Sequence, residues 1–191
     1  MSNLPHSRSL PPTVERAIPV LRRFGWISFW IQTILGVVAG LIFLFAVPVA
    51  TASKAEGAVS PETGPSGFLA VAGLVALFIS IYWSSRYPKL AKRLTVPNER
   101  PSKSETLKLI ERGLIINLVG MFFSLLAAET IAGVLLAKAL QSSGVTFSDL
   151  AQKTLIQPLD IFVVLGNTHT LVAHFAGLVS SLWLLKWINK S

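Results

Sequence analysis

The sequence contains no cysteine and little charge, and each shortage excludes a class of protein. Without cysteine there can be no disulfide, thiolate metal site, iron–sulfur cluster or cysteine nucleophile. Charged residues make up only 14% of the chain and hydrophobic residues 52%, whereas a soluble domain has about 25% charged residues. Too few polar groups are present to cover the surface of a folded domain. Lipid must cover much of it, so we expect an integral membrane protein.

Motifs for catalysis are lacking as well. The sequence has no Walker loop for phosphate, no HExxH zinc motif and no serine-hydrolase elbow. No acidic pair accompanies a nucleophile. We therefore expect that the protein is not an enzyme, and that no cofactor is certain.

Four long apolar runs are present instead. About 20 helical residues cross the ~30 Å hydrocarbon core of a bilayer, and each run has about this length. The predicted fold class is all-α, an integral membrane bundle of four transmembrane helices. We expect a flexible basic N-terminal tail at 1–20 and a four-helix transmembrane domain at 21–191, with helices near 24–49, 68–87, 103–140 and 158–188.

The ends of these runs carry their own signals. Arg22 and Arg23 precede the first run, as in a signal peptide, but the run exceeds the 7–15 apolar residues of such a segment, so we expect a retained helix. Ser102 and Glu105 have the spacing of a capping box, which predicts that the third helix starts near residue 103. Prolines in the preceding connection are expected to interrupt any earlier helix there. A short interfacial helix is expected at 148–156.

The net charge is +8, and the positive charges are unevenly distributed along the chain. They gather before the first run, in the 86–112 connection and after the last run. The positive-inside rule therefore predicts that both termini and this connection are cytoplasmic. Nucleic acid is not needed to explain the basic composition. The 86–112 connection could also hold anionic lipids, although a topology signal alone explains its charge.

Polar residues inside the runs carry most of the functional information, because lipid cannot satisfy them. Glu129 is the only acidic residue well inside a run. In the fourth run, polar residues recur every seven positions, with Thr170 and Gly177 between them, and so share one helical face. These recurring residues are Asp160, Asn167, His174 and Ser181. His169 lies off this face, so the two histidines cannot chelate one metal on a regular helix.

These residues form the candidate transport path or ion site: Glu129, His174, Asn167, Thr170 and Asp160. If the third and fourth helices are antiparallel neighbours, Glu129 could approach Thr170 or His174. A carboxylate and an imidazole together could take up a divalent cation or relay a proton. The alternative is that Glu129 is protonated and only hydrogen-bonded between helices. No metal ligand set is defined.

Small residues mark helix-packing faces on the runs. The glycines concerned are Gly36, Gly40, Gly120 and Gly177, which would allow helix backbones to approach closely. Gln32 and Asn117 lie on such faces and could line a polar path. Small faces of this kind would also permit a homo-oligomer or a larger membrane complex.

Two stretches resemble a known family. They are the basic-aromatic entry to the first helix at 21–30 (LRRFGWISFW) and the segment 159–178, which runs from Leu159-Asp160 through Asn167 to Gly177-Leu178. Together they resemble the four-helix membrane family shared by cyanobacteria and plastids. Its plant members are described as a chloroplast inner-envelope iron permease and also as a component of the inner-envelope protein translocon.

The resemblance implies a permease-like protein for iron, with an iron ion as its cargo. The alternative that it implies is a scaffold or a component of a protein-translocation complex. The first 20 residues do not resemble a transit peptide. A cyanobacterial plasma or thylakoid membrane is therefore the expected location, or the chloroplast inner envelope if the chain is from a plant.

Overall fold

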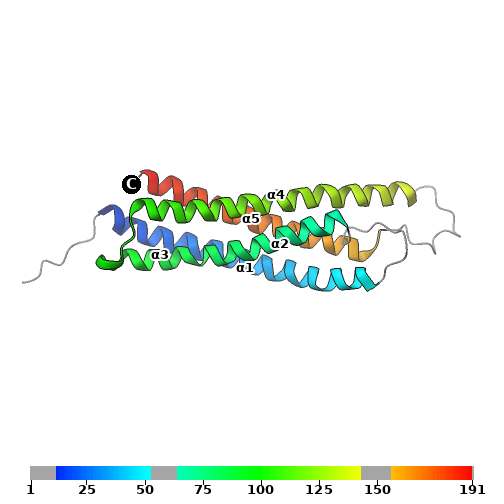
Figure 1. The fold of residues 1–191 in the computed structure, drawn as a ribbon, viewed down its shortest axis with the longest axis horizontal. Coiled ribbons are helices and arrows are strands. Elements are labelled where there is room, and N and C mark those ends of the chain that lie inside the picture. Colours follow the sequence, from blue (N-terminus) through cyan, green and yellow to red (C-terminus); the bar gives the residue numbers. More distant parts are fainter. Residues whose placement is uncertain (1–11, 53–63, 143–155, 191) are drawn as a thin grey trace, which may run out of the picture.

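The computed structural model describes residues 12–52, 64–142 and 156–190 and consists of long helices lying side by side (Figure 1). The elements are α1 (Pro12–Ala52), α2 (Pro65–Ser84), α3 (Arg86–Leu94), a 3-10 turn η1 (Pro97–Glu99), α4 (Lys103–Ser142) and α5 (Pro158–Lys190). Four helical stretches are long and apolar enough to cross a membrane, namely those of α1, of α2 with α3, of α4 and of α5. The predicted bundle of four transmembrane helices is confirmed.

The four long helices surround one common core. The main packing pairs are α2 with α4, α1 with α5, and α4 with α5, and α1 also contacts α2. The order around the bundle is therefore α1, α5, α4, α2. The start of α1 and the end of α5 lie at the same end of the bundle as α3 (Figure 1).

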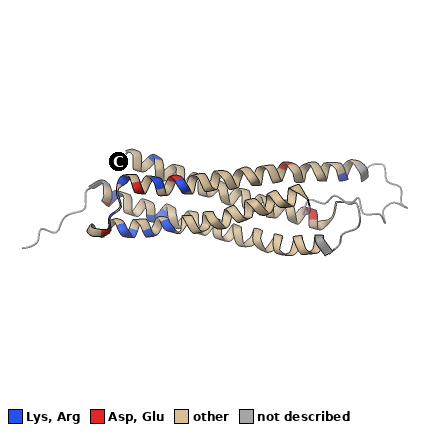
Figure 2. Ribbon diagram, in the orientation of Figure 1, with Lys and Arg blue, Asp and Glu red and all other residues tan. Residues whose placement is uncertain are grey.

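Lysine and arginine gather at that same end, around α3 and the starts of α1 and α4 (Figure 2). We call it the basic end, and the opposite end, where α4 ends and α5 begins, the far end. The helix termini Pro12 and Lys190 and the whole 86–112 connection belong to the basic end. That this end faces the cytoplasm remains a prediction from the positive-inside rule.

Two helix boundaries differ from the sequence prediction. α1 begins at Pro12, inside the segment predicted as a tail, and α3 forms although Pro88 lies within it. Pro88 is the third residue of α3, and in the first turn a proline removes no intrahelical hydrogen bond. The predicted capping box is present: the Ser102 N–H donates to Glu105 at 2.9 Å and the Glu105 N–H donates to Ser102 Oγ at 3.1 Å. The helix predicted at 148–156 falls almost wholly outside the described residues.

Two apolar clusters fill the bundle. Toward the far end, Phe43, Leu77 and Ile131 are among the buried residues. At the basic end, Leu21 and Tyr87 are among those that pack together. Buried polar side chains occur on all four long helices, and some of them lie between the two clusters. The outer surfaces of the helices are mostly apolar and face lipid.

Candidate functional site

Four buried polar side chains, one from each long helix, meet in the middle of the bundle. They are Gln32, Ser80, Asn117 and His174, each 1% exposed or less, and we call them the polar core. Ser80 Oγ lies 2.7 Å from Asn117 Oδ1 and 2.9 Å from Gln32 Oε1. Asn117 also donates from Nδ2 to the Gly113 carbonyl at 2.9 Å. Protein groups thus supply the hydrogen bonds that lipid cannot supply.

Glycines make room for the polar core. A Cβ at Gly120 would overlap the His174 ring, and one at Gly177 would overlap the side chains of Gln32 and Asn117. These two glycines, predicted from sequence as helix-packing positions, therefore accommodate polar side chains as well as a neighbouring backbone. Gly36 and Gly40, the other two predicted positions, face apolar side chains of α2 instead.

The His174 ring lies between two oxygen atoms. Nδ1 is 3.2 Å from Asn117 Oδ1, and Nε2 is 3.1 Å from the Gly73 carbonyl oxygen. A neutral imidazole has one N–H, so it can donate to only one of these two acceptors at a time. The ring is held as a hydrogen-bonding side chain between α4 and α2, whereas a metal ion would need several ligands directed at one point.

Asn167 and Thr170 lie on the buried face predicted for the fourth helix, at 2% and 0% exposure. Asn167 Nδ2 donates to the Ser124 carbonyl at 3.0 Å, and its Oδ1 is buried without a hydrogen-bond partner. Thr170 Oγ1 donates to the Gly166 carbonyl of its own helix at 3.0 Å. Asn167 therefore joins α5 to α4, while Thr170 satisfies its own hydroxyl locally.

Asp160, the last candidate on α5, is neutralised by a lysine from α4. Lys138 Nζ lies 2.8 Å from both carboxylate oxygens, and Asp160 is 1% exposed. The Gln157 N–H, at the start of α5, also donates to Asp160 Oδ2 at 2.8 Å. The carboxylate thus caps α5 and ties its first turn to α4 near the far end. With these partners it is not a free ligand for a cation.

Glu129 is not brought to His174. It is exposed on α4, nine residues or half a turn away from the Gly120 face that contacts His174. His169 is also off the buried face, and its Nδ1 lies 2.7 Å from the Leu165 carbonyl. Among the described residues, no group of three or more histidine, cysteine or acidic side chains could hold a metal ion.

Sequence reasoning did not find two further polar contacts at the basic end. Tyr87 OH lies 3.1 Å from Ser181 Oγ, and Trp83 Nε1 donates to the Leu109 carbonyl at 2.8 Å. Both aromatic residues lie close to the junction of α2 and α3, which the sequence does not reveal as a helix–helix corner. The signal that was available is Ser181, which continues the seven-residue spacing on α5 toward Tyr87.

Comparison with known proteins identifies the family. The model described as "Protein of unknown function (DUF3611)" matches residues 11–189. The chain belongs to this family. It is 33% identical to "Protein TIC 21, chloroplastic" of Arabidopsis thaliana over 183 residues, which are 92% of this chain and 59% of the relative. No solved structure gives a significant match.

The family indicates the broad location of the protein. The chain spans about three fifths of the length of the relative it matches. Four membrane-spanning helices and a chloroplast relative identify a multi-pass membrane protein of cyanobacterial or plastid type. This is the family that the 21–30 and 159–178 stretches indicated.

Proposed function

We propose that the protein is a permease-like membrane subunit that moves a divalent metal, with iron as the first candidate, and that it works as an assembly of subunits. Glu129 is the observation that carries this proposal. Charged residues inside membrane spans are costly, and those that occur usually mark ion or proton pathways. A carboxylate is also a suitable ligand for iron. The family resemblance, with plant members described as iron permeases, supports the choice of cargo.

The route is proposed to lie outside the protomer interior. The polar core is filled by hydrogen-bonded side chains and offers one imidazole and no carboxylate. Asp160 is held by Lys138. Glu129 faces away from the polar core and from Asp160, toward the molecules that contact α4 in the membrane. A metal path that uses Glu129 must therefore include a neighbouring molecule.

Uptake of ferrous iron into proteoliposomes tests this proposal. We expect saturable uptake by the wild type and its loss in Glu129→Gln, which removes the charge and keeps the shape. Ser80→Ala, in the polar core, is the matched control and should retain uptake if it remains folded. Uptake that survives in Glu129→Gln but is lost in Ser80→Ala would contradict the route.

The second candidate function is a non-transporting scaffold or a component of a protein-translocation complex. It is favoured by the hydrogen-bonded polar core, which resembles a structural joint between four helices more than a pathway. This function predicts no iron uptake above that of empty vesicles when insertion in both orientations is confirmed. That result would contradict the permease function and favour the scaffold function.

An anionic lipid is the partner that we propose for the basic end. A cavity of about 130 Å³ there is lined by apolar residues of α1 and α5 together with Arg100 and Lys103. Apolar walls beside two cations suit a phospholipid with an acidic headgroup. The double variant Arg100→Ala/Lys103→Ala should lose the thermal stabilisation that phosphatidylglycerol gives over phosphatidylcholine. Equal stabilisation in the wild type and the variant would exclude this site.

A further inference from the structure

Glu129 is exposed at a depth where its carboxyl group needs a partner. It lies 17 residues beyond Arg112, or about 26 Å along α4, which is within a ~30 Å hydrocarbon core that starts at that arginine. Helical side chains point toward the helix N-terminus, which for α4 is the basic end. The carboxyl group therefore points deeper into the membrane and cannot easily extend to the headgroups at the far end. No described residue of its own chain forms a hydrogen bond or ion pair with it.

His169 is another polar side chain outside the bundle core at a similar depth. Its Nδ1 lies 2.7 Å from the Leu165 carbonyl oxygen. A carbonyl only accepts, so the proton of a neutral ring is on Nδ1 and Nε2 is left as an acceptor. A carboxylic acid is the donor that fits this nitrogen. The carboxyl group and the ring are therefore complementary hydrogen-bonding partners.

The contact between Gly120 and His174 allows the two depths to be compared. Glu129 lies nine residues from Gly120 toward the far end, about 14 Å, and His169 lies five residues from His174 in the same direction, about 8 Å. The two helices run in opposite directions, so the Glu129 side chain points back toward the basic end and the His169 side chain toward the far end. These opposite tilts bring the two polar groups to nearly the same level.

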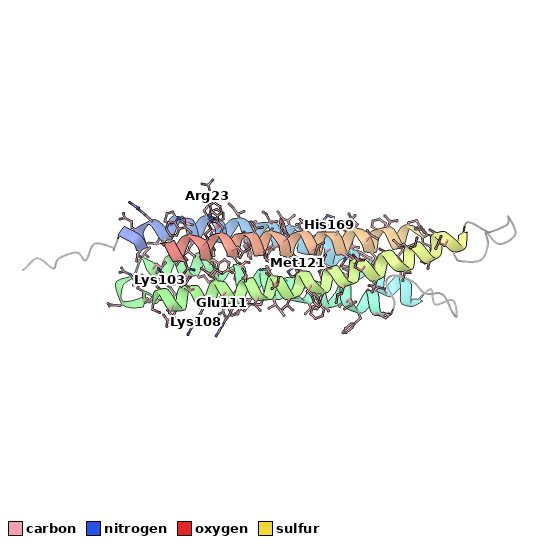
Figure 3. The ribbon with its side chains drawn as sticks, turned by 90° about the horizontal axis from the view of Figure 1, so that it is seen from above. Arg23, Lys103, Lys108, Glu111, Met121 and His169 are labelled. Atoms are coloured by element: carbon pink, nitrogen blue, oxygen red, sulfur yellow. The ribbon has the colours of Figure 1, made fainter. Side chains whose placement is uncertain are left out.

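The two side chains are on different sides of one protomer. Glu111, which is five full turns from Glu129 and so on the same face of α4, lies at the opposite edge of the bundle from His169 (Figure 3). One protomer cannot join Glu129 to its own His169. The pairing can be made only between two copies.

We propose that copies of this chain pack side by side in the membrane, with Glu129 of one copy against His169 of the next. The α4 surface beside Glu129 is suited to close approach, because a Cβ at Gly133 would meet nothing within 4 Å and Ala132 is exposed. Because different faces meet, the contact is heterologous and generates a ring or an array rather than an isolated symmetric pair. The contact names the neighbour of Glu129 that the proposed assembly of subunits requires and so rests on that part of the proposed function, but it is tested without metal transport, so that either proposal can fail alone.

Cysteine cross-linking in the membrane tests this contact, and the chain has no native cysteine to interfere. Leu126→Cys on α4 and Leu165→Cys on α5 replace exposed residues beside Glu129 and His169 and leave that pair intact. The two single-cysteine chains, with different tags, are co-expressed and oxidised, and dimers that contain both tags are counted. We expect abundant mixed dimers and few dimers of the Leu126→Cys chain with itself.

Two controls make the result specific. Val71→Cys lies on the exposed face of α2 at about the level of Leu126, and its pairing with Leu126→Cys should give few mixed dimers. Added to the Leu126→Cys chain, Glu129→Leu should lower the yield with Leu165→Cys by about three- to twenty-fold, the range for one interhelical hydrogen bond in a membrane. Glu129→Gln, which can still donate to Nε2, should lower it less. Cross-linking of Leu126→Cys mainly with itself or with another protein, or no cross-linking at all, would overturn the proposal.

Discussion

Replacement of Gly120 by alanine should destabilise the bundle, although alanine is the better helix former. The added Cβ would overlap the ring of His174, which is fully buried and bonded to α4 and α2. The ring cannot move away without loss of its contacts to Asn117 and to the Gly73 carbonyl. Gly133 on the same helix is the matched control for the interior of one protomer, because a Cβ there would meet nothing within 4 Å in its own chain.

The expected magnitude follows from three terms. Overpacking of a filled core costs about 1–3 kcal/mol, and each interhelical hydrogen bond that is lost in a membrane costs about 0.6–1.7 kcal/mol. Exchange of glycine for alanine in a helix returns about 1 kcal/mol. Gly120→Ala should therefore lower the free energy of unfolding by about 1–4 kcal/mol. Gly133→Ala should leave it unchanged or raise it by up to about 1 kcal/mol.

Unfolding by sodium dodecyl sulfate in mixed micelles, followed by far-ultraviolet circular dichroism, measures both variants. The reasoning is tested further in a His174→Ala background, where the space taken by the ring is free. There Gly120→Ala should cost little or nothing, so that the two substitutions are strongly coupled. An equal cost of Gly120→Ala with and without the His174 ring would refute the argument.

Three further predictions concern the ends of the bundle. Asp160→Asn leaves the Lys138 ammonium without its partner and should lower the free energy of unfolding by about 3 kcal/mol, measured by chemical unfolding. The double replacement Lys138→Met/Asp160→Leu should leave it nearly unchanged. An equal cost for both variants would contradict this. Ser102→Ala removes the capping bond to the Glu105 N–H and should lower the free energy of unfolding by about 1 kcal/mol in the same assay. An unchanged value would mean that the cap does not form in the purified protein. In intact cells a membrane-impermeant maleimide should not label Ser104→Cys, and labelling from outside would reverse the predicted topology.

The number of membrane-spanning helices was predictable because length and hydropathy decide it without any knowledge of packing. The buried face of α5 was predictable as well, since Asn167, His174 and Ser181 recur at a spacing that only one helical face can explain. The early start of α1 was missed, although Val14, Leu21 and the residues between them have apolar helical spacing and pack in the cluster at the basic end. The neighbouring prolines had suggested a tail, but Pro12 at the first helical position is tolerated.

The position of Glu129 shows where the sequence reasoning stopped short. Asn117 and Gly120 lie on the buried face of α4, and Glu129, half a turn away from Gly120, must point away from that face. The expectation that Glu129 approaches His174 uses only their depths along the membrane normal and ignores the direction in which each side chain points around its helix. By contrast, the pairing of Lys138 with Asp160 could not be deduced, because it depends on the register between α4 and α5.

Cysteine accessibility at the polar core tests the central claim, that the interior of the protomer is a structural joint and any metal route lies outside it. Ser80→Cys is a conservative change in a cysteine-free chain. Ser104→Cys, at an exposed position at the start of α4, provides the positive control. In proteoliposomes, with and without ferrous iron, we predict that a small water-soluble thiol reagent modifies Ser104→Cys and leaves Ser80→Cys unmodified. Modification of Ser80→Cys that ferrous iron slows would show a metal pathway through the polar core and would contradict the account.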